Sequence, residues 1–213
     1  MSIIAKANSE SKFSKIPLPE TGTTRAVCCA VWDLGLQKSS YKGEDKIKHK
    51  IVIAWEIDQL IDVPESDYNG MPYMLSKTYT LSLYDNANLR KDLESWRGKS
   101  FTDAEIEKGL DVSTLYGINC LIGITHAPSK KDPSKIYPNI SSILPPMKGA
   151  EKMKPMRGQN DEAPKWVSEK QSQALSEDFE IGKSLSTQSW SDSPQPFGDE
   201  YPHGSDVESS VTY

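Results

Sequence analysis

The sequence has few cysteines and no long apolar run. Its three cysteines are an odd number, and two of them, Cys28 and Cys29, are adjacent, so together with Cys120 they do not make a disulfide framework. We interpret them as small core residues in a reducing compartment. No stretch approaches the roughly 20 apolar residues of a membrane-spanning helix, and no apolar segment of signal-peptide length stands at the N-terminus. These absences predict a cytoplasmic protein without a membrane partner.

The chain also lacks the motifs of common catalytic and metal sites. It has no G-x-S-x-G nucleophile elbow and no phosphate-binding glycine loop. The three histidines, His49, His126 and His203, stand far apart and show no metal-ligand spacing. We therefore expect a protein that is not an enzyme, with no cofactor and no metal.

Charge is distributed unevenly along the chain. The formal net charge is −5 over 213 residues, with 36% hydrophobic residues and a mean hydropathy of −0.58. From residue 161 to the end there are eleven acidic and three basic residues, which leaves +3 on the first 160 residues. Low hydrophobicity predicts that part of the chain is unpacked. We predict a mildly basic body and an acidic tail.

Three regions follow from composition. Residues 1–22 are polar with two prolines and predict a flexible N-terminal arm. Residues 23–149 carry the strand and helix patterns and form the expected domain. Residues 150–213 are expected to be a linker and an acidic, largely disordered tail, with a short amphipathic helix in "KWVSEKQSQAL" around Trp166.

The sequence of residues 23–149 predicts three strands, then a helix, then two more strands. Residues 25–35 and 47–57 predict a long hairpin, because Ile51, Ile53, Trp55 and Ile57 share one face of the second strand and Lys46, Lys48, Lys50 and Val52 lie on the opposite face. A third strand, "MLSKTYTLSLY", precedes a helix that is expected to begin near Asn86 or Asn88 and end at Gly98. "SFTDAEIEKGL" and "DVSTLYG" predict a second short helix and one more turn. Residues 118–127 and 136–146 are the last strands, the final one at an edge because of its internal proline.

This order predicts a mainly β fold, a five-stranded Greek-key barrel of the OB-fold type with a helical insert between strands 3 and 4. A small β-sandwich is the alternative, although it usually lacks the mid-chain helix. The helix carries a conspicuous "LRKDLESWR". Leu89, Leu93 and Trp96 form one apolar stripe along it, so we interpret this helix as a plug on the barrel end.

In an OB-fold, strands 2 and 3 and the loops joining strands 1–2 and 4–5 bind oligonucleotides. Both loops are rich in lysine and carry one tyrosine each, which matches the phosphate tracking and base stacking of single-strand binders. Solvated loops are the alternative interpretation. The expected nucleic-acid-binding residues are Trp32, Lys38, Tyr41, Lys42, Lys46, Lys48, Lys50, Lys77, Lys130, Lys131, Lys135 and Tyr137. Trp32 is equally compatible with the core, and His49 and His126 are expected to be structural.

Three segments, "SKTYTLSLYDNANLRKDLESWRGKSFT", "LYGINCLIGITH" and "YPNISSILPPMKG", resemble tailed-phage single-stranded DNA-binding proteins with an OB-fold. The resemblance covers about residues 25–149. It implies a protein that coats and protects exposed single strands during phage DNA replication or recombination, in the host-cell cytoplasm. It assigns no base-contacting residue.

We therefore expect a sequence-tolerant binder of single-stranded DNA. The acidic tail resembles those of replication single-strand binders, which recruit replication or recombination proteins and compete with DNA when free. Binding to duplex DNA and self-association on DNA stay open. The alternative is a phage interaction protein that uses the barrel to bind a host replication or nuclease component, because a fold does not dictate a function.

Overall fold

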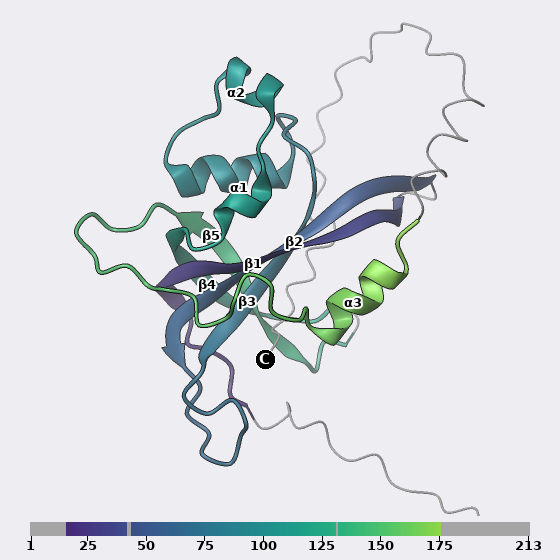
Figure 1. The fold of residues 1–213 in the computed structure, drawn as a ribbon. Helices are drawn as coiled ribbons and strands as arrows, with labels where there is room; N and C mark the ends of the chain where they lie inside the picture. Colours follow the sequence, from purple (N-terminus) through teal and green to yellow (C-terminus); the bar gives the residue numbers. More distant parts are fainter. Residues whose placement is uncertain (1–15, 42–43, 131, 176–213) are drawn as a thin grey trace, which may run out of the picture.

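One five-stranded antiparallel sheet forms the centre of the molecule. The computed structural model describes residues 16–41, 44–130 and 132–175. The strands are β1 (Gly22–Tyr41), β2 (Glu44–Leu60), β3 (Pro72–Thr80), β4 (Asn119–Pro128) and β5 (Ile136–Leu144). Their order in the sheet is β3-β2-β1-β4-β5 (Figure 1). The mainly β prediction, the first hairpin and the edge position of the last strand are confirmed.

The helices lie between β3 and β4 and after β5. They are α1 (Asn88–Arg97), α2 (Asp103–Lys108), the 3₁₀ turn η2 (Val112–Leu115) and α3 (Lys165–Ser172). α1 begins at Asn88, as predicted, but neither Asn86 nor Asn88 caps it, because the residue before the helix is Ala87 and no side chain forms a cap hydrogen bond. Gly98 ends α1 with a φ of 70°, a left-handed conformation that glycine adopts readily. Thr102 and Glu105 form a capping box that starts α2.

The β1–β2 hairpin extends well beyond the rest of the sheet. β3 pairs with β2 as far as Lys50, opposite Thr80, and β4 pairs with β1 as far as Val27. Two irregularities in register, at Cys28/Ala30 and at Asp33/Gly35, bend β1. The end of the hairpin therefore projects from the body (Figure 1).

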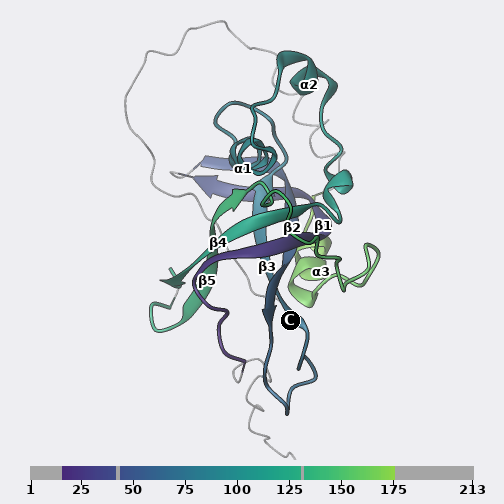
Figure 2. The ribbon, with the colours of Figure 1, turned by 90° about the vertical axis from the view of Figure 1, so that its left-hand side faces the viewer.

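The main core lies between the sheet and α1. Trp55, at the centre of β2, is fully buried, and its ring centroid lies 5.7 Å from that of Trp96 on α1. The indole nitrogen of Trp96 donates a hydrogen bond to the carbonyl of Asn119 at 2.9 Å. Leu89 and Leu93 are buried beside it. The apolar stripe of α1 thus packs on the sheet as predicted, with α1 above the strands in Figure 2.

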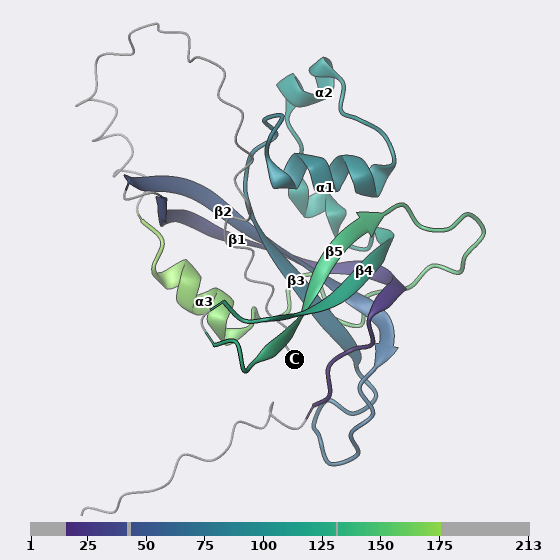
Figure 3. The ribbon, with the colours of Figure 1, turned by 180° about the vertical axis from the view of Figure 1, so that it is seen from behind.

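A second core lies on the opposite face of β1 and β2, under a segment that we call the C-terminal strap (residues 150–175). Trp32, Val52 and Met74 are buried there against Val167 of α3. Figure 3 shows α3 beside the hairpin. The strap was expected to be a linker with one helix. The helix is confirmed, but the strap is docked, because only a covered face can bury this apolar surface.

The N-terminal boundary also differs from the prediction. Ile16 is buried in the main core, and the hydroxyl of Tyr73 donates to the carbonyl of Pro17 at 2.9 Å. Residues 16–21 therefore pack on the body, while the rest of the expected arm, residues 1–15, and of the expected tail, residues 176–213, lie outside the described residues.

Candidate nucleic-acid interface

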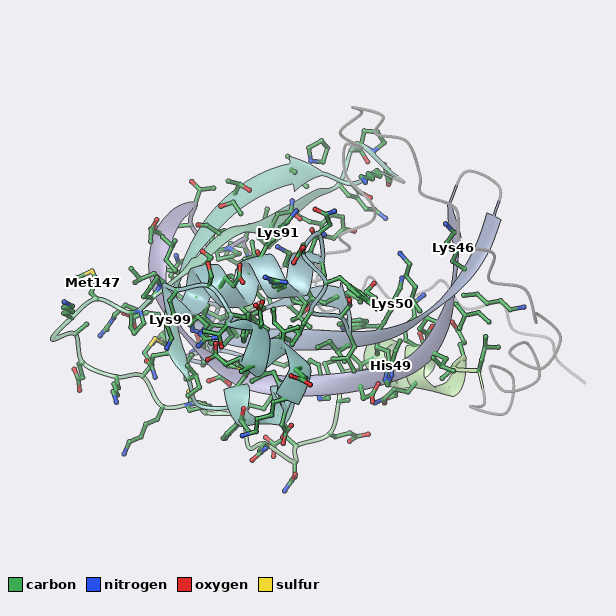
Figure 4. All side chains as sticks on the ribbon, turned by 90° about the horizontal axis from the view of Figure 1, so that it is seen from above. Lys46, His49, Lys50, Lys91, Lys99 and Met147 are labelled. Atoms are coloured by element: carbon green, nitrogen blue, oxygen red, sulfur yellow. The ribbon has the colours of Figure 1, made fainter. Side chains whose placement is uncertain are left out.

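Four lysines of the β1–β2 hairpin form the first half of the candidate surface. Lys46, Lys48 and Lys50 share one face of β2, whereas Lys38 on β1 is opposite Ile47 and therefore lies on the other face of the hairpin. Lys38, Lys46 and Lys48 are exposed and Lys50 is half-buried. Figure 4 shows Lys50 and His49 pointing to opposite sides of β2, as strand alternation requires. We call this group the hairpin lysines (Lys38, Lys46, Lys48, Lys50).

The β4–β5 turn supplies the second half. Lys130 and Lys135 are exposed, and Lys135 pairs with Asp132 at 3.6 Å, a weak exposed ion pair. Tyr137 is 39% exposed, so its ring is accessible, as predicted. Ile136, just before Tyr137, is 54% exposed. It stands at the start of the edge strand, opposite Pro128.

The two predicted loops project on the same side of the molecule. In Figures 3 and 4 the hairpin and the β4–β5 turn both lie away from the segment after β5, which carries Met147. The reason is the sheet order, which places β1 between β2 and β4. The structure thus places both loops on the side away from the segment after β5.

Two predicted contact residues have structural roles instead. Trp32 is 8% exposed and is covered by the strap, so it cannot stack on a base. Lys77 has its ammonium 2.6 Å from the carboxylate of Asp92 on α1, and 5.5 Å from the ring centroid of Tyr79. Both predictions are wrong for the same reason: another element packs over a strand face that looked exposed in the sequence.

Three more residues of the prediction are Tyr41, Lys42 and Lys131. Lys42 and Lys131 lie outside the described residues, and so does the side chain of Tyr41. Their contribution stays a prediction.

The two histidines of the body hold local structure. Nε2 of His49 lies 2.7 Å from Oδ1 of Asp33, which also accepts a hydrogen bond from the backbone of Gly35. Nε2 of His126 lies 2.8 Å from the carbonyl of Pro19. His49 and Asp33 therefore hold the bulge of β1 at Asp33/Gly35, which lies opposite Ile51 and Lys50 of β2.

The basic residues of "LRKDLESWR" are largely used inside the fold. Arg90 donates to Asp85, to Glu94 and to the carbonyl of Leu83, and it fastens the loop before α1. Arg97 donates to Glu105 at 2.6 Å. This agrees with the interpretation of α1 as a plug rather than a contact surface.

Sequence reasoning missed one aromatic side chain near the hairpin. Tyr84 is 85% exposed, in the loop that follows β3. The backbone of Leu81 donates to the carbonyl of His49 at 2.8 Å, so this loop begins beside the hairpin lysines. The sequence placed Tyr84 at the end of the predicted third strand, because the sequence does not reveal that β3 stops pairing at Thr80.

Sequence reasoning also missed the anchor of the strap. Glu56, on β2, is 4% exposed, and its two carboxylate oxygens accept the backbone N–H groups of Met156 and Arg157 at 2.6 and 2.9 Å. Asn119 adds a reciprocal pair with the backbone of Met153 at 3.0 and 2.8 Å. A buried carboxylate is stable only with such partners. The only sign of Glu56 in the sequence was that it is a single acidic residue within an apolar strand.

The cysteines are buried and free, as predicted. Burial raises the pKa of the Cys28 thiol to about 12 and raises the pKa of Cys120 as well. Burial also raises the pKa of Cys29, and the negative charge of Glu56 adds to this rise. In the described part of the chain, no cluster of three or more His, Cys, Asp or Glu side chains could hold a metal ion.

Comparison with known proteins found no protein-family model and no curated protein that matches this chain. None of the helices in the described ranges has the length and apolar character needed to cross a membrane.

Proposed function

We propose that this protein is a sequence-tolerant single-stranded DNA-binding protein whose sheet closes as an OB-type barrel. The sheet order β3-β2-β1-β4-β5 and the insertion of α1 between β3 and β4 support this fold. The observation that carries the function is the pair of lysine-bearing loops on one side of the sheet, where this fold binds oligonucleotides.

Lys46, Lys48 and Lys50, which share one face of β2, would neutralise successive phosphates along a strand, and Lys38 would add positive charge from the other face of the hairpin. In single-strand binders, lysines track the backbone and each stacked base adds about 1–3 kcal/mol. Tyr137 and Tyr84 are exposed aromatic side chains that could take this part. Tyr41, Lys42 and Lys131 complete the proposed surface from the loop tips. A protein of this kind would coat exposed single strands during phage DNA replication or recombination.

The direct test is a titration of the full chain with fluorescent oligo-dT and with a matched duplex, over a range of salt concentrations. We expect tighter binding to the single strand, weakening as salt increases, with a slope of about −0.7 per phosphate contact. No salt-sensitive binding to either DNA would contradict the proposal. A preference for the duplex would keep DNA as the partner and revise the mechanism.

A triple variant locates the surface. Replacing Lys46, Lys48 and Lys50 by glutamine should reduce the salt slope by about 2 and weaken binding without sequence preference. The matched control replaces Lys99, Lys148 and Lys154, which are exposed on other parts of the body. Equal losses in both variants would mean that net charge, rather than the hairpin, determines the affinity.

The alternative function is a phage interaction protein that binds a host replication or nuclease component. It would gain support if the full chain bound no DNA in these titrations. The acidic tail, residues 176–213, is the proposed site for replication or recombination partners in either case.

A further inference from the structure

A groove lies at the end of the molecule away from the hairpin lysines. It has a volume of about 770 Å³ and runs between α1, α2, η2 and the residues that follow β5. Most of its wall is apolar and includes Trp96, Phe101, Leu110, Leu115, Ile118 and Pro145. Ile118 is 48% exposed. Exposed apolar side chains that gather in a concave pocket indicate a binding site, whereas single exposed apolar residues on a flat surface do not.

The charges of the groove favour an acidic occupant. Its two acids are already held, Glu105 by Arg97 at 2.6 Å and Asp111 by the backbone and hydroxyl of Ser113 at 3.0 and 2.7 Å. Lys108 and Lys152 also line the groove, both exposed, and neither forms an ion pair within the described ranges. The groove thus combines an apolar wall with two lysines available for carboxylates.

The chain itself contains a segment of matching chemistry. "FGDEY" (residues 197–201) places two acids between two aromatic residues. Prolines at 194, 196 and 202 flank it. Because proline restricts its own φ and favours extended conformations in the residue before it, such a segment loses less entropy on binding in an extended form.

The length of the chain permits the contact. Phe197 stands 22 residues after Leu175, the last described residue. Twenty-two residues span up to roughly 70 Å, whereas a domain of this size has a radius of gyration of roughly 15 Å. We propose that residues 197–201 dock in the α1–α2 groove of their own chain, with the aromatic rings on the apolar wall and Asp199 and Glu200 near Lys108 and Lys152.

This docking is independent of DNA binding. The groove is built from α1, α2, η2 and residues 145–152, none of which carries a hairpin lysine. In Figure 4, Lys99 lies toward the end that carries Met147, and Lys46 and Lys50 lie toward the other end. The tail would therefore have a site of its own, distinct from the surface on which it would compete with DNA.

Photo-crosslinking in the full chain tests the proposal. With p-benzoylphenylalanine in place of Phe197, we expect cross-links to residues 93–118 and 145–152 of the same chain, identified by mass spectrometry. Lys108→Glu together with Lys152→Glu should lower the yield roughly tenfold. Asp199→Lys with Glu200→Lys should restore the yield in that background, as a charge swap requires.

The control is Lys46→Glu with Lys48→Glu, which should leave the yield unchanged. Three results would each overturn the proposal. They are cross-links to residues 38–50, cross-links to a second copy of the chain, and a cross-linking yield that is the same with and without the charge-reversing substitutions. Near-ultraviolet circular dichroism verifies that every variant is folded. Because no DNA is present, failure of this experiment is separate from failure of the DNA-binding proposal.

Discussion

The ammonium of Lys77 and the carboxylate of Asp92 lie 2.6 Å apart and join β3 to α1. The same carboxylate accepts the hydroxyl of Tyr79 at 2.7 Å, and burial together with this negative charge raises the pKa of Tyr79. The contact removes Lys77 from the candidate DNA surface. It also shows that polar groups, as well as the apolar stripe of α1, orient this helix over the sheet.

Lys77→Met should lower the free energy of unfolding by about 1.5–3 kcal/mol, because Asp92 loses a charged partner in a partly buried site. DNA affinity should stay at the wild-type value. Urea unfolding and the oligo-dT titration measure the two effects. The control Lys91→Met, at an exposed position of α1, should stay within about 0.5 kcal/mol. A large loss of affinity in folded Lys77→Met would return Lys77 to the binding surface.

Trp96→Ala should cost about 3–5 kcal/mol of folding free energy. The substitution removes the ring that packs on Trp55 and the hydrogen bond to the carbonyl of Asn119. Chemical denaturation followed by far-ultraviolet circular dichroism gives the value. A loss below about 1 kcal/mol would show that α1 is not an essential cover of the core.

Val167→Ala should cost about 1.5–3 kcal/mol, since Val167 is fully buried between α3 and the sheet. Ser168→Ala, at the next and exposed position, is the control and should change stability by less than about 0.5 kcal/mol. Thermal unfolding of the two variants provides the comparison. Equal stability would mean that the strap contributes little to the fold.

Glu105 should titrate with a pKa of about 2, below its ordinary value of 4.5, because Arg97 and the capping box at Thr102 stabilise its charged form. A depressed pKa stabilises the folded state above pH 4.5, and this contribution is lost as the pH falls from 4.5 to about 2. Arg97→Gln should raise the pKa toward 4.5, and Lys99→Gln should leave it unchanged. Carboxyl chemical shifts across this range measure it. A midpoint near 4.5 in the wild-type chain would contradict the ion pair.

The order of the elements follows from local sequence patterns. Period-2 alternation along β2 placed Ile51, Ile53 and Trp55 on one face, and this is where they lie. Leu89, Leu93 and Trp96 predicted the buried stripe of α1, and Ser100 and Thr102 were the two candidate caps of the second short helix, of which Thr102 is the one that caps α2. These patterns were readable because each depends on neighbours in the chain.

The second core was not readable in the same way. Trp32 and Val52 lie on the face of β1 and β2 opposite the main core, and the strap that covers them arrives more than a hundred residues later in the chain. Its attachment depends on Glu56 and Asn119, whose partners are backbone N–H and C=O groups of the strap. Every residue has these backbone groups, so no pattern of side chains in the sequence predicts such a contact.

For the candidate surface, too, some properties follow from the sequence and others only from the tertiary structure. The sequence by itself determined that both loops carry lysines, and the order of the strands implied that these loops share a side. Only the tertiary structure decided which of the named residues stay accessible: Lys48 and Tyr137 do, whereas Trp32 lies under the strap and Lys77 pairs with Asp92. The physical reason is that exposure depends on what packs over a strand from a distant part of the chain, and alternation within the strand specifies only its two faces.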